Sequence, residues 1–339
     1  MFKLFRAGDW WQYKIAPVVA LVAATTLVEH KALLPLWREI ALLVVALAVC
    51  AAYVSVVNDL ADGADDRAAQ KLNRQLAYSK GVVLAVIAFT IAAGAAIAWR
   101  WRDQPFLLAS YLGSWLVFSL YSLPPFRFKG RGFAGVLCDA AGAHLFPALT
   151  AILVASGRGA WDRAWMAAAA VWAFSYGVRG ILWHQLADRD SDALAGMQTF
   201  AVRRPVVAAR LGAWIAFPAE IAALSVLLWR IAQPLPLIAL VCYALLLAAR
   251  VRHGLTLVVV TPKPGCISVM QEYYDVFFPI ALLLCAAARD WHALILVAAF
   301  IAFFPHGFMR VARDFRQVSL EFAVMLRDAF RVPRPRTPS

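Results

Sequence analysis

Long apolar stretches alternate with short charged segments along the chain until a final polar stretch begins near residue 310. A helix that crosses a membrane needs about 20 predominantly apolar residues, with a range of roughly 17–25. The pattern predicts ten such helices, over residues 14–29, 36–57, 81–99, 105–121, 133–155, 164–184, 206–229, 235–249, 273–288 and 291–308. We therefore expect an all-α, polytopic membrane bundle of about nine or ten transmembrane helices.

Composition agrees with this fold class and excludes several others. Hydrophobic residues make up 63% of the chain and charged residues only 16%, whereas soluble domains average roughly 45–50% and 25%. A soluble enzyme, a disordered chain and a coiled coil are therefore excluded. The pattern divides the chain into a transmembrane domain over residues 1–309 and a basic cytoplasmic tail over residues 310–339.

The net charge of +13 would suggest nucleic acid as a partner in a soluble protein. In a membrane protein, it is better explained by cytoplasmic loops that face anionic lipid, so we expect the lipid bilayer and no nucleic acid as a partner. Most Lys and Arg fall in segments that lie on one side, which are the N-terminus, the loops after the second, fourth and sixth spans, and the tail. The positive-inside rule predicts that these segments are cytoplasmic, in a membrane of the bacterial inner-membrane type.

Acidic residues are scarce, with 20 in the whole chain, yet two short clusters contain seven of them. One cluster follows the second span over residues 58–66, and the other follows the sixth span over residues 184–192. A shift of 126 residues places Asp62 on Asp188 and Asp66 on Asp192. This match indicates a degenerate internal repeat with one acidic motif in each half.

The spacing within the clusters predicts a metal site. Asp59, Asp62 and Asp66 would share one face of a helix, and so would Asp188 and Asp192. A carboxylate within a bilayer costs at least about 2.5–3.5 kcal/mol, so five of them require a wet cavity or cations. Carboxylate oxygens without Cys or several His favour Mg²⁺, which also binds phosphate oxygens.

A metal site that binds a diphosphate also needs basic side chains for the outer oxygens. Four polar residues follow the first cluster: Arg67, Lys71, Asn73 and Arg74. The loop after the fourth span reads Tyr121-Ser-Leu-Pro-Pro-Phe-Arg-Phe-Lys129. Its two prolines stiffen the turn, and we expect them to hold Arg127 and Lys129 in place.

These motifs, taken in order, resemble the UbiA superfamily of intramembrane prenyltransferases. The pattern NDxxDxxxD is matched by Asn58, Asp59, Asp62 and Asp66. The pattern DxxxD with a spaced Gly and Thr is matched by Asp188, Asp192, Gly196 and Thr199. The pattern YSxPPxRxK is matched by Tyr121, Ser122, Pro124, Pro125, Arg127 and Lys129. The resemblance covers roughly residues 10–310.

The resemblance implies a helical bundle around a central cavity in which two Mg²⁺ ions, held by the five motif aspartates, bind an isoprenyl diphosphate. Ionisation of the diphosphate would leave an allylic cation that alkylates an acceptor. The expected substrate-binding residues are Asn58, Arg67, Lys71, Asn73, Arg74, Tyr121, Arg127, Lys129 and His184. The acceptor is expected to be aromatic, but a quinone-ring precursor, a tetrapyrrole and a phosphosugar are all compatible with the sequence.

Two other activities remain open for the same motifs. A terpene cyclase would let the substrate's own double bond attack the cation, and an ion-coupled transporter would use the acidic clusters to bind a translocated ion.

His184 and Gln185 occupy positions where many members of the superfamily have Asn-Asp. We expect His184 either to orient Asp188 by a hydrogen bond or to act as a general base. Glu272 and Asp275 are expected to cap a helix or to contact the acceptor.

Overall fold

The computed structural model describes residues 7–63, 78–264 and 266–316, and most of these residues are helical. The longer helices are α2 (Ala16–Val28), α3 (Trp37–Ala61), α5 (Lys80–Arg100), α6 (Pro105–Ser122), α9 (Arg163–Ala187), α13 (Phe217–Ile231) and α14 (Pro234–Arg252). The shorter ones are α1 (Ala7–Trp10), α7 (Phe133–Ala140), α8 (Phe146–Ser156), α10 (Arg189–Leu194), α11 (Phe200–Arg203), α12 (Pro205–Leu211), α15 (Phe278–Arg289) and α16 (Leu294–Phe303). Two short strands, β1 (Thr256–Val258) and β2 (Cys266–Ser268), pair in parallel.

Seven helical segments of the described residues are long and apolar enough to cross a membrane. They are Trp11–Val28, Leu34–Ala61, Lys80–Arg100, Pro105–Ser122, Phe133–Ser156, Pro205–Ile231 and Pro234–Arg252. Helix α9 packs against α7 and α13, and α15 packs against α2 and α14, so both belong to the same bundle. The prediction of an all-α membrane bundle is confirmed.

The last predicted span, 291–308, differs from the structure. Helix α16 ends at Phe303, and the next helix, Pro305–Arg316, is bent from Trp291–Phe303 by 88°. Proline has no backbone N–H and its ring clashes with the preceding turn, so Pro305 begins a new helix instead of extending α16. This bent pair would make an eighth candidate span among the described residues if it crosses the membrane as one unit.

Four helices of the bundle begin with a wider, π-helical turn. These turns are Trp11–Ile15 before α2, Ala141–Leu145 before α8, Gly212–Ala216 before α13 and Tyr273–Phe277 before α15. The second residue of each following helix is a proline: Pro17, Pro147, Pro218 and Pro279. Each π turn gives the proline ring room where a regular α-helical turn would clash with it, so the helix continues past the proline.

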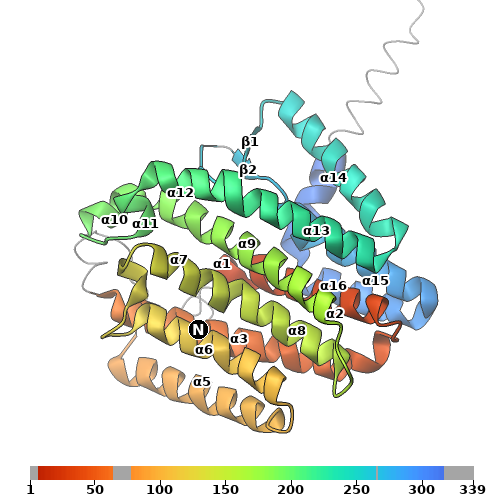
Figure 1. Cartoon of the computed structure of the whole chain (residues 1–339), viewed down its shortest axis with the longest axis horizontal. Coiled ribbons are helices and arrows are strands. Elements are labelled where there is room, and N and C mark those ends of the chain that lie inside the picture. The colour runs from red at the N-terminus through yellow and green to blue at the C-terminus, as the bar shows by residue number, and fades with distance from the viewer. Residues whose placement is uncertain (1–6, 64–77, 265, 317–339) are drawn as a thin grey trace, which may run out of the picture.

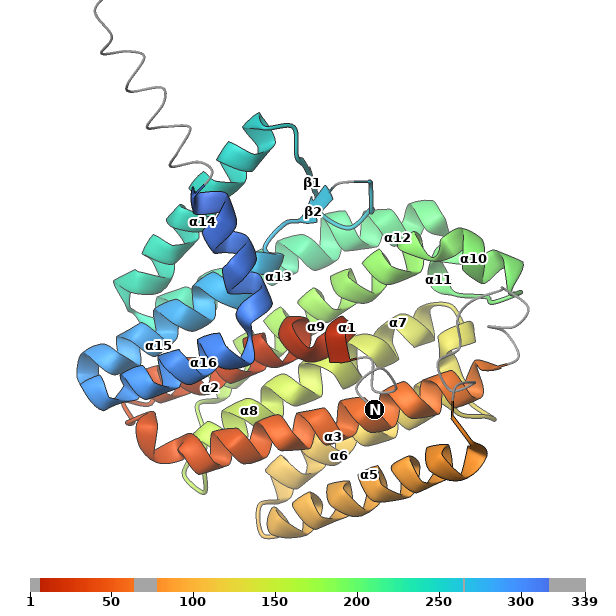
Figure 2. The same ribbon diagram turned by 180° about the vertical axis from the view of Figure 1, so that it is seen from behind.

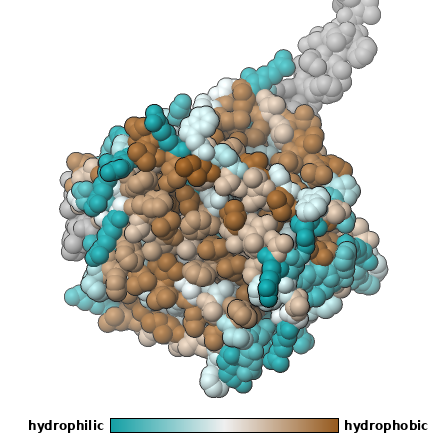
Figure 3. Space-filling view, viewed as in Figure 1, coloured by the Kyte–Doolittle hydropathy of each residue, from teal (hydrophilic) through white to brown (hydrophobic). Residues whose placement is uncertain are grey.

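The helices lie roughly along one direction and form a bundle (Figures 1 and 2). Helix α3 packs against α5 and α6 at one edge, and α13 and α14 lie at the opposite edge. Helices α7, α8 and α9 lie between these two edges. On the face shown in Figure 3, apolar residues form a broad band and hydrophilic residues gather on two opposite sides of it. This distribution is the one that a bilayer requires.

A fully buried ion pair joins α9 to α13. Arg179 Nε donates to Glu220 Oε2 at 2.7 Å, and the Tyr274 hydroxyl donates to Glu220 Oε1 at 2.8 Å. Arg179 Nη1 also donates to the Ser268 hydroxyl at 3.0 Å, which attaches the segment containing β2 to the bundle. Charges inside membrane proteins are normally paired in this way, so we interpret this cluster as structural.

Candidate active site

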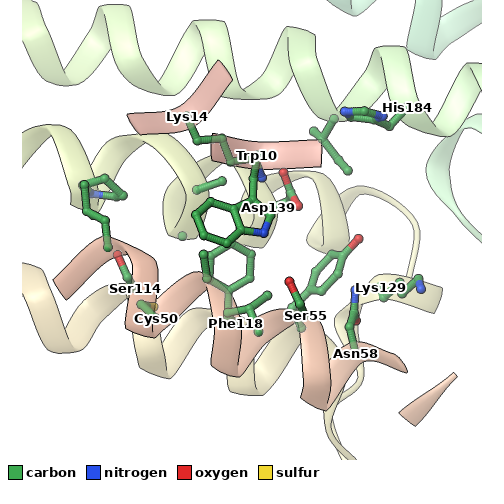
Figure 4. A pocket seen from close by; sticks show the side chains of 18 of the residues that line it. Trp10, Lys14, Cys50, Ser55, Asn58, Ser114, Phe118, Lys129, Asp139 and His184 are labelled. Atoms are coloured by element: carbon green, nitrogen blue, oxygen red, sulfur yellow. The ribbon is translucent and has the colours of Figure 1, made fainter. Parts of the chain in front are cut away.

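A cavity of about 470 Å³ lies between α3, α6, α7, α8 and α9, with the N-terminal helical turns on one side. Figure 4 shows side chains from these elements pointing into it. Eight of the lining residues are positions of the three sequence motifs: Asn58, Asp59, Asp62, Tyr121, Lys129, Asp188, Asp192 and Thr199. His184 and Gln185, which come shortly before the second acidic motif, line the cavity as well. The structure thus brings residues from three distant segments to one cavity.

The described parts of the two acidic motifs end their helices in the same way. Asp62 directly follows the last residue of α3, and Asp188 directly follows the last residue of α9. In each case, the aspartate N–H donates to the carbonyl oxygen four residues earlier, at 2.9 Å, from Asp62 to Asn58 and from Asp188 to His184. Because both aspartates terminate a helix in the same way, the structure agrees with the repeat seen in the sequence.

The first motif is buried and is connected to the loop after α6. Asp59 is 7% exposed and Asp62 is 8% exposed. The Ser122 hydroxyl donates to Asn58 Oδ1 at 2.8 Å. Arg127 Nη2 donates to Asp62 Oδ1 at 3.1 Å, and Lys129 forms an ion pair with Asp62 Oδ2. The basic residues that the sequence assigned to a diphosphate therefore neutralise a predicted metal ligand in this structure.

The loop that holds these basic residues has an unusual backbone. The Pro124-Pro125 peptide bond is cis, and Arg127 has a φ of +37°, in the left-handed region. An arginine is rarely found there. The Arg127 N–H donates to the Leu123 carbonyl at 2.9 Å, and Arg127 also donates to the Ala61 carbonyl at 3.2 Å. These contacts hold the Arg127 side chain against the end of α3.

The second motif is more open. Asp188 is exposed, and α10 begins immediately after it. The Asp192 N–H donates to the Asp188 carbonyl at 2.8 Å, which keeps the two aspartates one helical turn apart. Gly196 has a φ of +72°, a conformation that glycine adopts without strain. This explains the spaced glycine of the motif.

The chemistry of this cavity suits a hard divalent cation. Its acidic wall offers carboxylate and amide oxygens from Asn58, Asp59, Asp62, Asp188 and Asp192, and such oxygens are the ligands that Mg²⁺ prefers. Within the described residues, no three His, Cys, Asp or Glu side chains are close enough to hold one metal ion. The donor types fit Mg²⁺, but the ion pairs of Asp62 with Arg127 and Lys129 would have to open.

Not every predicted site residue is placed. Asp66, Arg67, Lys71, Asn73 and Arg74 lie outside the described residues, so their proposed roles remain predictions.

Glu272 and Asp275 are placed, and neither of them lines the cavity. Glu272 pairs with Arg250 and Arg310, and Asp275 accepts a hydrogen bond from Gln271 at 2.9 Å. These contacts give both residues internal partners and do not support the expectation that they contact the acceptor.

Sequence reasoning did not assign three residues whose side chains line the cavity and could bind or react there: Trp10, Lys14 and Asp139. Asp139 had a readable signal, because it is a carboxylate within the predicted span 133–155 and such residues are rare in membranes. Lys14 lies at the edge of a predicted span and was counted only as a loop charge. Trp10 had no signal beyond its aromatic ring.

Comparison with known proteins then identifies the family. The model of the UbiA prenyltransferase family matches residues 16–257. This chain belongs to the UbiA prenyltransferase family. The match spans both acidic motifs and the loop between them, so the resemblance inferred from the motifs is confirmed. No curated protein matches the chain.

Solved structures with the UbiA fold agree with this assignment. A UbiA homologue from Archaeoglobus fulgidus bound to DMAPP and Mg²⁺ has a TM-score of 0.58 and 16% identity, over 84% of this chain and 98% of that one. A structure of a UbiA homologue from the same organism bound to GPP and Mg²⁺ has a TM-score of 0.55 and 17% identity, over 92% and 99% of the two chains. At this identity, the likeness shows a shared UbiA fold.

Proposed function

We propose that this member of the UbiA family is an Mg²⁺-dependent prenyltransferase that ionises an isoprenyl diphosphate and transfers the prenyl group to an acceptor, for which we favour an aromatic ring. One observation carries the proposal. Carboxylates from two motifs 126 residues apart line one cavity together with Lys129, and apolar side chains line much of the rest of it, beside polar residues such as Ser55, Ser114 and Thr150. One cavity can therefore bind both the diphosphate and the hydrocarbon chain of a prenyl donor.

The residues at the acidic end would hold the leaving group. We assign metal binding to Asp59, Asp62, Asp188 and Asp192, with Asp66 as a further predicted ligand. Bound Mg²⁺ would neutralise the charge that develops on the departing diphosphate. Lys129 and Arg127 would donate to its outer oxygens, and Asn58 and Tyr121 would position it.

The rest of the cavity would hold the prenyl chain. Leu47, Val54, Phe118 and Ile181 are among its lining residues. Apolar walls exclude water, which would otherwise capture the cation before the acceptor does. The expected arrangement places this site near the cytoplasmic surface, with residues 1–309 as the transmembrane domain and 310–339 as its tail. The positive-inside bias and the position of the motif residues at the ends of α3, α6 and α9 support this arrangement.

The test measures pyrophosphate released from geranyl diphosphate by the purified full chain in lipid nanodiscs, with and without Mg²⁺. We expect Mg²⁺-dependent release that Asp188→Asn abolishes. Asp190→Asn is the matched control, because Asp190 is exposed, pairs with Arg189 and does not line the cavity. Release that is independent of Mg²⁺, or equal loss in both variants, contradicts the proposal.

Product analysis tests the transfer step. Mass spectrometry of lipids from a deletion strain should reveal a missing prenylated compound, and the purified protein should restore it. A cyclised hydrocarbon formed from the donor alone would show that the chain is a terpene cyclase instead. Ion flux across proteoliposomes without pyrophosphate release would favour a transporter.

A further inference from the structure

Asp139 is a carboxylate in the cavity that belongs to none of the three motifs. It lies on α7, within the candidate span Phe133–Ser156, and lines the same cavity as the motif aspartates. Among the residues that the structure describes, it takes part in no hydrogen bond or ion pair. A charged side chain within a membrane is costly unless it is paired or has a function. Asp139 therefore requires an explanation that packing does not provide.

Asp139 lies close to the acidic end of the cavity but is set back from the start of its span. It lies six residues into the span that begins at Phe133, which at a rise of about 1.5 Å per residue is about 9 Å along the helix. The Tyr121 hydroxyl lies within electrostatic range of Asp139, Asp62 and Asp192. Asp139 is thus adjacent to the acidic end but farther along the cavity wall.

The surroundings of Asp139 favour a positive charge. Trp10, Phe118 and Tyr121 line the same cavity, and the rings of Phe118 and Tyr121 are 6.4 Å apart and perpendicular to each other. Figure 4 shows Trp10, Phe118 and Asp139 pointing into one space. Aromatic faces attract cations, and a carboxylate in a low-dielectric site does so more strongly.

We propose that Asp139 stabilises the allylic cation formed when the donor ionises. This inference rests on the proposed prenyl transfer. In the step, the bond between C1 of the prenyl group and the diphosphate oxygen breaks, and both electrons leave with the diphosphate. The positive charge that remains on the allyl unit faces the Asp139 carboxylate, which forms no covalent bond. Negative charge placed where positive charge develops lowers the barrier selectively.

The test compares two ligands of equal shape and different charge. Geranyldimethylamine is protonated at neutral pH and mimics the cation, whereas geranyl methyl ether is neutral. Their affinities are measured by calorimetry in the presence of Mg²⁺ and inorganic pyrophosphate, for the wild-type chain and for Asp139→Asn. We expect the variant to weaken binding of the ammonium on the order of 10- to 100-fold and binding of the ether less than about twofold.

Two controls make the comparison specific. Asp190→Asn removes a carboxylate near the motifs but outside the cavity wall, and it should leave both affinities unchanged. Geranyl thiolodiphosphate, which ionises poorly, should bind with Mg²⁺ equally well to the wild-type chain and to Asp139→Asn. Asp139→Ser supplies a second neutral replacement if the asparagine variant does not fold.

Each outcome is decisive. If Asp139→Asn weakens binding of the ammonium and of the ether equally, Asp139 affects the shape of the cavity and not its charge. If the affinity for the ammonium is unchanged, the Asp139 carboxylate does not stabilise a positive charge at that position. Either result overturns the inference and leaves the proposed prenyl transfer intact. Failure of the wild-type chain to bind geranyl thiolodiphosphate with Mg²⁺ would instead contradict the proposed function itself.

Discussion

The ion pairs of Asp62 predict that metal and diphosphate help each other to bind. Lys129 and Arg127 both pair with Asp62, so a metal ion that arrives alone must displace them. A diphosphate attracts the same two basic side chains and would release the carboxylate for the metal. Binding energies are reciprocal, so metal should also raise the affinity for diphosphate. We therefore expect Lys129→Met to bind metal alone more tightly than the wild-type chain does.

The structure sets the size of this effect. At the 3.1 Å separation of Arg127 and Asp62, Coulomb attraction is about 1.3 kcal/mol in bulk water and about 5 kcal/mol at an effective dielectric constant of 20. The Asp62 and Lys129 side chains are 11% and 22% exposed, which places the Lys129 pair between these limits. If Lys129→Met removes about 2 kcal/mol of ion-pair attraction that a metal ion must otherwise overcome, the metal should bind roughly 30-fold more tightly.

The assay titrates Mn²⁺ into the purified chain and follows free Mn²⁺ by electron paramagnetic resonance, with and without inorganic pyrophosphate. In the wild-type chain, pyrophosphate should tighten Mn²⁺ binding at least tenfold, and Lys129→Met should reduce this gain. Arg131→Met is the matched control, because Arg131 is exposed and donates to the Pro125 carbonyl instead of Asp62. Unchanged or weaker binding of Mn²⁺ alone by Lys129→Met would refute the reasoning.

The remaining predictions concern catalysis and stability. Asp62→Asn and Asp188→Asn should each reduce pyrophosphate release on the order of 100-fold or more while the protein still folds; near wild-type turnover at saturating Mg²⁺ would disprove the two-motif site. His184→Asn should retain most activity and an unchanged pH profile if His184 orients Asp188, whereas loss of an acidic limb in the pH profile would identify it as a base. Arg179→Met should lower the free energy of unfolding by about 3–5 kcal/mol because it leaves Glu220 buried without its ion-pair partner. In denaturant titrations, the double variant Arg179→Met/Glu220→Leu should recover much of that loss, and failure to recover would show that the charges themselves stabilise the fold.

The positions of the apolar helices and of the two acidic motifs were predictable because each depends on local sequence. A helix in a bilayer must satisfy its own backbone and present apolar side chains, so composition within a window of about 20 residues is sufficient. The same holds for the ends of α3 and α9, where Asp62 and Asp188 follow the last helical residue. Their assignment needed only the position of the apolar run and the matching acidic pattern.

The pairing of residues far apart in the chain was not predictable in this way. The ion pair between Arg179 and Glu220 joins helices whose contact no local pattern reveals. The ion pair of Lys129 with Asp62 depends on which face of the loop after α6 meets α3, which no local pattern reveals. The predicted span 291–308 continued past Phe303 because the residues on both sides of Pro305 are mostly apolar, whereas the structure bends by 88° there.

Asp62 and Asp188 end their helices in the same way, but their charged surroundings differ. Asp62 is buried and paired with two basic side chains, whereas Asp188 is exposed and makes no side-chain ion pair among the described residues. A metal ion that approaches the cavity would meet less competition at Asp188 than at Asp62. We therefore expect the second motif to take the first metal ion, and the first motif to become available when a diphosphate draws Lys129 and Arg127 away. In such an order, the complete metal site would assemble only when the donor diphosphate is present.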